Sequence, residues 1–266
     1  MRDFILLNSK SGTALRWVPP NSFSFLASVP LLPVHAAEAG RIGSALPLAL
    51  CGEPDQPSGW TLVAVCGREP KSNTMVSGSG QWLAKSVPDS VRYLPFALKN
   101  IGGGKALAAI DPRYAGKVLV PRDPAVSLYG EDGEMHAAAR KRVEYLAEHQ
   151  PKISRTQEIL ALLEETGLIV PWPEAALNAG GITLEGLHTI DEKKLSQLDD
   201  DAFLALRRSG ALATAYSCLL SLYQVRNFAS TPRGAKPSSE TAVQTTGDLD
   251  LEFLNEDETI KFGPLR

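Results

Sequence analysis

The sequence predicts an α+β fold in which a strand-rich N-terminal half packs against a helical C-terminal half. From Phe23 to about Val120, apolar runs of strand length recur between clusters of Gly, Pro, Asn and Ser, which is typical of short antiparallel strands. After Gly133, apolar residues fall at helical spacing within charged segments. We therefore expect one domain with a strand-rich half at residues 1–133, a helical half at 134–228, and a flexible acidic tail at 229–266.

The strand-rich half is expected to form an antiparallel sheet. Its clearest pair of strands is separated by seven residues that include Pro54, Pro57 and Gly59, a composition that suits a hairpin loop. The candidate strands are Phe23–Val29, Leu46–Gly52, Trp60–Gly67, Met75–Ser77, Lys105–Ile110 and Lys117–Val120, with Phe4–Leu7 as an edge strand or an ordered arm.

Helices are expected mainly in the second half. In the first half, the alanine-rich segment Val34–Ile42 predicts a short helix, and Pro88 predicts the first turn of another because proline lacks an N–H that would be unpaired there. The later candidates are Glu134–Glu148, Ser154–Glu165, Glu192–Leu198, Asp199–Arg208 and Ala211–Phe228, with an extended segment at Ile182–Ile190. The last helix is apolar on most of its surface, so we expect it to form the buried centre of this half.

The composition limits the classes of function that this protein can have. With 266 residues and 44% apolar content, the chain can bury a sizeable core. The tail carries seven acidic and four basic side chains, so the formal net charge of −3 leaves the body up to Phe228 neutral. A neutral body argues against nucleic-acid binding by counterion release.

Neither a secretory signal nor a membrane span is expected. The longest uncharged stretch that could be helical, Ala211–Gln224, is shorter than the roughly 20 residues that a span requires. Three cysteines without Cys-x-x-Cys spacing predict neither a disulfide framework nor a structural zinc site. We expect a soluble, cytoplasmic protein without a metal or cofactor, and leave open an association with the cell envelope through a partner.

Arg92 is the leading candidate for ligand binding. It stands in an apolar setting, where a guanidinium needs carboxylate or carbonyl partners such as those of Glu38, Asp89 or Asp111. It could clamp an anionic ligand or a peptide carboxylate. The alternative, which we weight more heavily, is a structural anchor for the loop that follows Trp82.

Four further residues are candidates for ligand binding near Arg92. His35 and Glu38 are three residues apart and share a helical face, so they could act as an acid and base pair or bind a metal together. Because no third ligand stands at a useful spacing, we favour a capping or core role for them. Asn73 and Trp82 bracket a loop with two glycines, and Trp82 could line a groove or pack in the core. No residue stands out as catalytic.

The tail supplies candidates for partner binding. Residues 248–258 alternate acidic and apolar side chains, so an extended conformation would place the apolar ones on one face. Such a segment could add as a strand to a partner or to this chain's own sheet, or could remain a solvated acidic tail. The candidate contact residues are Leu249, Leu251, Phe253, Ile260 and Phe262.

The order of motifs resembles the SapC-like family of bacterial proteins. The matching positions are Asn73, Met75, Val76, Ser77, Gly80 and Trp82, then Ser86-Val87-Pro88, then Arg92-Tyr93-Leu94-Pro95-Phe96. The chain differs from the family pattern at Ser77, where members carry Asp, at Ser86, where they carry Tyr, and in having one arginine at Arg92 instead of two. The resemblance covers roughly residues 23–228 and implies a surface-layer association by name, but no catalytic residues.

These observations favour a non-catalytic binding or assembly protein with a protein or peptide partner. The alternative is an enzyme, or an accessory subunit of one, with a pocket where Arg92 meets the Asn73–Trp82 loop. An enzyme requires converging titratable groups, and Arg92, Glu38 and His35 are the closest set that the sequence offers.

Overall fold

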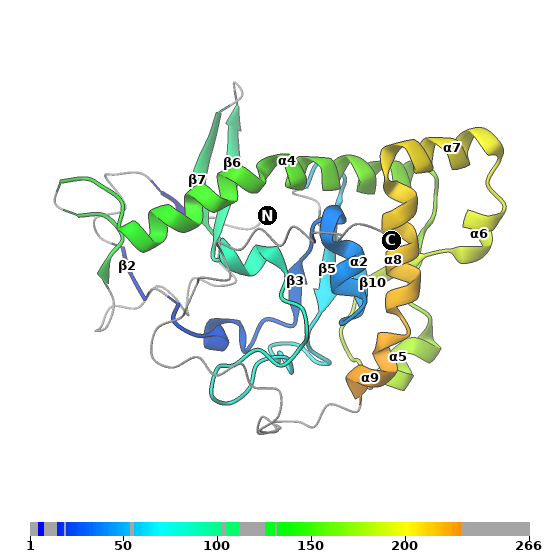
Figure 1. Ribbon diagram of the computed structural model, residues 1–266, viewed down its shortest axis with the longest axis horizontal. Helices are drawn as coiled ribbons and strands as arrows, with labels where there is room; N and C mark the ends of the chain where they lie inside the picture. The colour runs from blue at the N-terminus through cyan, green and yellow to red at the C-terminus, as the bar shows by residue number, and fades with distance from the viewer. Residues whose placement is uncertain are drawn as a thin grey trace, which may run out of the picture.

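The computed structural model describes residues 5–7, 15–18, 20–53, 56–102, 105–111, 126–130 and 132–229. The strand predicted at Lys117–Val120, the acidic tail beyond residue 229 and the five partner-binding candidates in that tail lie outside the described residues. Within the described part, antiparallel sheets come first in the chain and most of the helices follow them, so the α+β prediction is confirmed (Figure 1).

The main sheet is antiparallel with five strands in the order β3-β5-β4-β10-β9. The predicted hairpin forms, with Leu50 of β4 opposite Leu62 of β5. Strands β9 and β10 come from the helical half and complete the sheet of the first half, so the two halves share one layer. The strands are β3 (Leu31–Pro33), β4 (Leu48–Gly52), β5 (Trp60–Val65), β9 (Ile169–Pro171) and β10 (Leu187–Ile190).

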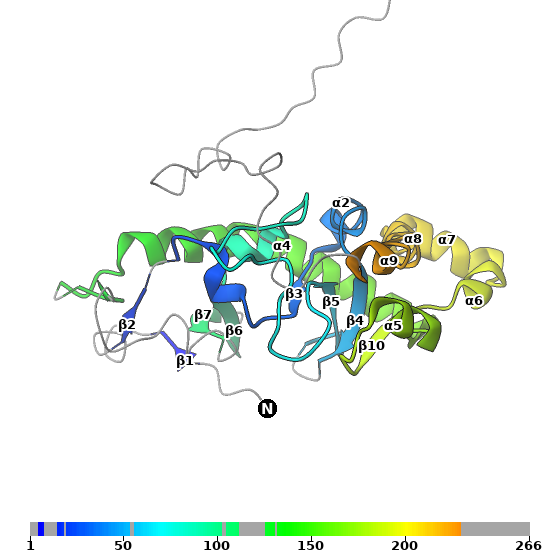
Figure 2. The same ribbon diagram turned by 90° about the horizontal axis from the view of Figure 1, so that it is seen from below.

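Two smaller sheets lie beside the N-terminal part of the longest helix (Figure 2). In one, β1 (Ile5–Leu6) adds to the edge of the hairpin formed by β6 (Phe96–Gly102) and β7 (Lys105–Ile110), so the first segment is an edge strand. The other pairs β2 (Arg16–Trp17) with β8 (Val126–Ser127). Strand β6 was not among the predicted strands, and the predicted strand Met75–Ser77 is wrong, because Val76 forms only an isolated bridge with Trp82.

The predicted strand at Phe23–Val29 is wrong, because residues Phe23–Leu26 form the 3-10 helix η1. The Ser22 hydroxyl accepts a hydrogen bond from the Ser24 N–H at 3.3 Å. Local hydrogen bonds of this kind let the backbone N–H groups of a serine-rich segment find acceptors without pairing to a neighbouring strand. The short helices of the first half are confirmed as η2 (Ala36–Glu38) with α2 (Ala39–Gly43), and η3 (Asp89–Arg92) after Pro88.

The two helices predicted at Glu134–Glu148 and Ser154–Glu165 are one continuous helix, α4 (Ala137–Glu165), with Pro151 inside it. The prediction failed because tertiary packing outweighs the local cost of a proline. Leu146 on one side of Pro151 and Ile159 on the other are both buried, while Pro151 itself is exposed. Figure 1 shows α4 running along most of the molecule.

Aspartate side chains cap two of the C-terminal helices. Asp191 accepts from the Lys194 N–H and Asp199 accepts from the Ala202 N–H, which start two of them. Gly210, with φ of 81°, separates the next two. The predicted helix Ala211–Phe228 is interrupted at Leu222–Tyr223. The elements are α5 (Glu174–Gly180), α6 (Glu192–Ser196), α7 (Asp200–Ser209), α8 (Ala211–Ser221) and α9 (Gln224–Ala229).

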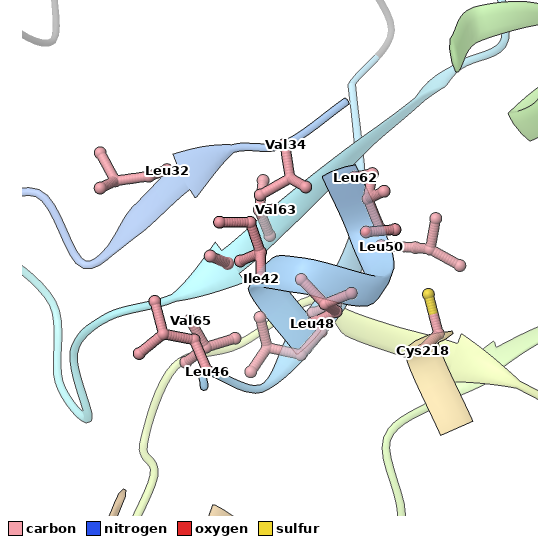
Figure 3. Packing of buried hydrophobic residues seen from close by; sticks show 14 of the residues in the cluster. Leu32, Val34, Ile42, Leu46, Leu48, Leu50, Leu62, Val63, Val65 and Cys218 are labelled. Carbon is pink, nitrogen blue, oxygen red and sulfur yellow. The ribbon is translucent and has the colours of Figure 1, made fainter. Parts of the chain in front are cut away.

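Two hydrophobic clusters form the core. The larger cluster fills the space between the main sheet, α2, α8 and the C-terminal part of α4; Figure 3 shows Ile42 of α2 among Leu48 and Val63 of the sheet, with Cys218 of α8 beside them. The smaller cluster centres on Trp17, Phe96 and the N-terminal part of α4. Helix α4 therefore contributes to both clusters.

Candidate functional site

Helix α4 carries a row of polar side chains between the part that packs in the smaller hydrophobic cluster and the part that packs in the larger one. Five residues follow one another at intervals of three and four, which places them on one face of the helix. They lie between Ala139, which belongs to the smaller cluster, and Ile159, which belongs to the larger one. The five are Arg142, Tyr145, His149, Lys152 and Thr156. With the facing residues His35, Glu38, Arg92 and Tyr93, they form what we term the polar junction.

Arg142 anchors the turn that contains the Arg-Tyr-Leu-Pro-Phe motif. Its Nη1 donates to the backbone carbonyls of Val91, Arg92 and Leu94 at 2.8–3.1 Å. The peptide bond between Leu94 and Pro95 in this turn is cis. Burial lowers the pKa of Arg142 to about 10, so it remains charged at neutral pH.

His149 is held in one tautomer. Its Nδ1 lies 2.9 Å from the Tyr145 carbonyl oxygen, which can only accept, so Nδ1 carries the proton. Nε2 then accepts from the Lys152 ammonium at 3.1 Å. The ring stacks on Tyr145 with centroids 4.0 Å apart and lies 6.0 Å from the ring of His35.

His35 is buried beside these rings. Its Nε2 is 3.4 Å from the Tyr93 hydroxyl. Desolvation lowers its pKa to about 4; Asp89 opposes this shift, and the nearby His149 and Lys152 side chains add to it. His35 is therefore neutral at physiological pH.

Glu38 is a buried carboxylate that satisfies backbone donors. It accepts from the N–H of His35 at 3.2 Å and from the N–H of Asp89 at 3.1 Å, and it pairs with Arg41 at 2.6 Å. The sequence left open whether Glu38 caps its helix, and it does. Desolvation and the neighbouring charge of Asp89 raise its pKa to about 7, against the opposing effect of these hydrogen bonds and Arg41.

Arg92 lies against Tyr145 in the same junction. Its Nη1 donates to the Tyr145 hydroxyl at 3.2 Å, and its guanidinium carbon is 5.6 Å from the centre of the Tyr145 ring. The structure thus gathers three of the predicted residues, His35, Glu38 and Arg92, around the Tyr145 and His149 side chains.

Asn73 and Trp82 hold a separate turn together. The Asn73 side chain accepts from the Met75 N–H at 2.9 Å, and the Trp82 indole donates to the Ser86 carbonyl at 2.9 Å. Trp82 also packs against Phe23 of η1 with ring centroids 5.6 Å apart. Ser77, which stands where the family pattern has Asp, accepts from the Gln81 N–H at 3.0 Å. A carboxylate there would accept the same bond, so this motif position serves the turn.

Sequence reasoning missed Arg142, Tyr145, His149 and Thr156. Their spacing of three and four residues is a signal that could have found them, because it marks one helical face. The spacing was overlooked because two separate helices were predicted, whereas the row continues along one helix past Pro151. Thr156 shows the result: its hydroxyl accepts from the Ala36 N–H at 2.9 Å and so joins α4 to η2.

A second feature lies on the surface of α8. The prediction that this helix forms a buried centre is correct for one side only. Its buried side chains are Ala211, Thr214, Ala215, Cys218 and Ser221. In contrast, Tyr216 and Leu220 of α8 and Tyr223 in the turn after it are 45%, 64% and 75% exposed, and we term these three residues the α8 face.

Close packing of α2 against α8 explains this arrangement. A Cβ on Gly43 of α2 would lie 3.3 Å from the Ser217 carbonyl and 3.3 Å from the Ser221 Cβ. The Ser221 hydroxyl accepts from the Leu48 N–H at 2.9 Å. Only small side chains fit between backbones at this separation. The larger Leu212 and Leu219 pack half-buried at the edge of the core, while Tyr216 and Leu220 are exposed.

Comparisons with known proteins place the chain in a family. Among the described residues, no helix has the combined length and apolar character of a membrane span. No curated protein and no solved structure matches the sequence. The SapC family profile matches residues 7–228, which include the polar junction, the 73–82 turn and the α8 face. The chain belongs to the SapC family.

Proposed function

We propose that this protein is a non-catalytic binding protein that engages a protein or peptide partner through the α8 face. The distribution of side chains around α8 carries the proposal. Burying a large apolar side chain contributes about 1.5–3 kcal/mol, so a helix that served folding alone would turn Leu220 and the tyrosines inward. Here every fully buried side chain of α8 is small, Leu212 and Leu219 are only half-buried, and Tyr216, Leu220 and Tyr223 are exposed to solvent.

Charge indicates the chemistry of the partner. Helix α8 contains no charged residue, but exposed arginines precede and follow the face in the sequence: Arg207 and Arg208 in the last turn of α7, and Arg226 three residues after Tyr223. Residues 202–239 contain no Asp or Glu at all. A segment that combines apolar with acidic side chains is the complementary ligand.

The polar junction supports this proposal through its structural role. Its groups satisfy backbone atoms: Arg142 binds three carbonyls, Glu38 accepts two N–H groups and Thr156 joins two elements. A junction of this kind fixes the position of α4 between two apolar clusters. In the proposed function it stabilises the scaffold that presents the α8 face.

Capture experiments with matched variants test the proposal. Leu220→Ser/Tyr223→Ser removes two large exposed side chains, and Lys141→Ser/Glu144→Ser removes two exposed side chains from α4 as the control. Exposed positions cost within about 0.5 kcal/mol when changed, so both chains should fold. In native-cell extracts, we expect the control to retain the partner of the unmodified chain and the α8 variant to lose it at least tenfold. Equal capture by both variants would contradict the proposal.

An enzymatic role is the second candidate, and one observation favours it. The pKa of Glu38, raised to about 7, suits a general base, and Arg92 and Tyr145 belong to the same junction. This role predicts a turnover whose rate rises with an apparent pKa near 7 and disappears in Glu38→Gln. Partner capture that is unchanged in Glu38→Gln but lost in the α8 variant would favour the binding role.

A further inference from the structure

We infer that residues 248–258 of this chain occupy its own α8 face until a partner displaces them. The inference rests on the proposed function, because it takes the α8 face to be the binding surface. It adds regulation in cis to that function. Three observations carry it: the exposed apolar face, the opposite charges of two neighbouring segments, and the length of chain between them.

The chemistry of the two segments is complementary. The face offers Tyr216, Leu220 and Tyr223 within a stretch, residues 202–239, that has only basic charges. Residues 248–258 have only acidic charges, and they carry apolar side chains between the acids. These apolar side chains are Leu249, Leu251, Phe253 and Leu254, and the acids are Asp248, Asp250, Glu252, Glu256, Asp257 and Glu258. Apolar contacts can form while the acids approach Arg207, Arg208 and Arg226.

The connecting segment is long enough. Helix α9 ends at Ala229, directly after the α8 face, and residues 230–247 lead to the acidic segment. A random coil of this length would have a root-mean-square span of about 23 Å. Helix α8 has 11 residues and is about 16 Å long, so the segment can reach every part of the face.

Tethering makes even weak contact effective. A short flexible linker gives an effective local concentration in the millimolar range. A segment with millimolar intrinsic affinity would therefore occupy the face for a large fraction of the time. A partner with a similar acidic and apolar segment must compete with it, which sets a threshold for partner binding.

Hydroxyl-radical footprinting of the full chain tests the inference. The modification rates of Tyr216 and Tyr223 are read by mass spectrometry in three chains: the unmodified chain, Leu249→Ser/Leu251→Ser/Phe253→Ser, and the matched linker control Val243→Ser. Tyr93, which is 6% exposed, serves as the internal reference. We expect both surface tyrosines to react several times faster in the triple variant than in the other two chains, at every protein concentration over a tenfold dilution.

Two results would overturn the inference. Equal rates in all three chains would show that the acidic segment does not cover the face. Protection that disappears on dilution would assign the covering segment to a second copy. In either case, loss of partner capture by Leu220→Ser/Tyr223→Ser would leave the proposed function standing, so the two failures are distinguishable.

Discussion

Glu38 and His35 are three residues apart in the sequence and are both buried. Burial moves their pKa values in opposite directions. Desolvation disfavours the charged form of each group, which is the anion for Glu38 and the cation for His35. The pKa of Glu38 rises from 4.5 to about 7, and that of His35 falls from 6.5 to about 4. Asp89, Arg41, His149 and Lys152 are the charged or titratable neighbours that modify these shifts.

These shifts predict opposite pH dependences of stability. The folded state holds the Glu38 proton more tightly than the unfolded state, so the stability from Glu38 is present below pH 4.5 and is lost as the pH rises to about 7. The folded state holds the His35 proton less tightly, so the stability from His35 is present above pH 6.5 and is lost as the pH falls to about 4. Between pH 4.5 and 6.5 the two effects oppose each other.

Single variants separate the two effects. Relative to Glu38→Gln, the unmodified chain should lose about 3 kcal/mol of unfolding free energy as the pH rises from 4.5 to 7. Relative to His35→Gln, it should gain about 3 kcal/mol as the pH rises from 4 to 6.5. Urea denaturation at closely spaced pH values measures both differences. Slopes of the same sign would refute the account of the polar junction.

At the scale of elements, the 73–82 turn depends on a glycine that a larger residue cannot replace. Gly80 has a φ of 80°, and its carbonyl accepts from the Phe23 N–H of η1 at 2.9 Å. A Cβ at this position would overlap the Ser24 hydroxyl and lie 3.0 Å from the Ser22 Cβ. The turn and η1 therefore pack backbone against backbone.

Comparing Gly80→Ala with Gly186→Ala measures how much this close packing contributes to the free energy of unfolding. Gly186 also has a positive φ, of 72°, but a Cβ there would meet nothing within 4 Å. Gly186→Ala should cost about 1 kcal/mol from backbone strain alone, whereas Gly80→Ala should cost roughly 2–3 kcal/mol from strain and overlap together. Urea denaturation compares them, and the additional change Ser24→Gly should recover part of the loss at Gly80. Equal costs at both glycines would show that the turn does not pack tightly on η1.

The sequence predicted elements well wherever local signals determine them. The hairpin Leu48–Gly52 with Trp60–Val65 and the caps Asp191 and Asp199 follow from turn and capping chemistry. The prediction failed at Pro151 and at Phe23–Val29. In the first case packing on both sides of the proline holds one helix together, and in the second the serine hydroxyls favour a tight turn.

The site was predictable to a smaller extent. Glu38, His35 and Arg92 were identified from residue type and spacing, and they do lie in one junction. Their partners on α4 were not identified, because contacts between residues more than 50 positions apart, such as Arg92 with Tyr145, depend on tertiary structure. The exposure of Tyr216, Leu220 and Tyr223 could not be predicted either, since helical spacing shows that residues share a face but not whether that face is covered.

At the scale of the whole molecule, one side of α8 packs in the core and the other side is exposed to solvent. The buried side of α8 packs with small residues against α2 and β4, next to the sheet that both halves of the chain build. Helix α4 joins the two hydrophobic clusters through the polar junction. This division leaves Tyr216, Leu220 and Tyr223 exposed to solvent, on the surface where we propose that a partner binds.

Site-specific photo-crosslinking tests the central claim most directly. A photoreactive residue replaces Leu220 in the full chain carrying Leu249→Ser/Leu251→Ser/Phe253→Ser, which we expect to leave the face uncovered, and replaces exposed Lys141 on α4 in the control. We predict that position 220 crosslinks in native cells to one recurrent partner, at a segment with alternating acidic and apolar residues, and that position 141 does not. Equal crosslinking from both positions, or no recurrent partner at position 220, would contradict the assignment of the α8 face as the binding surface.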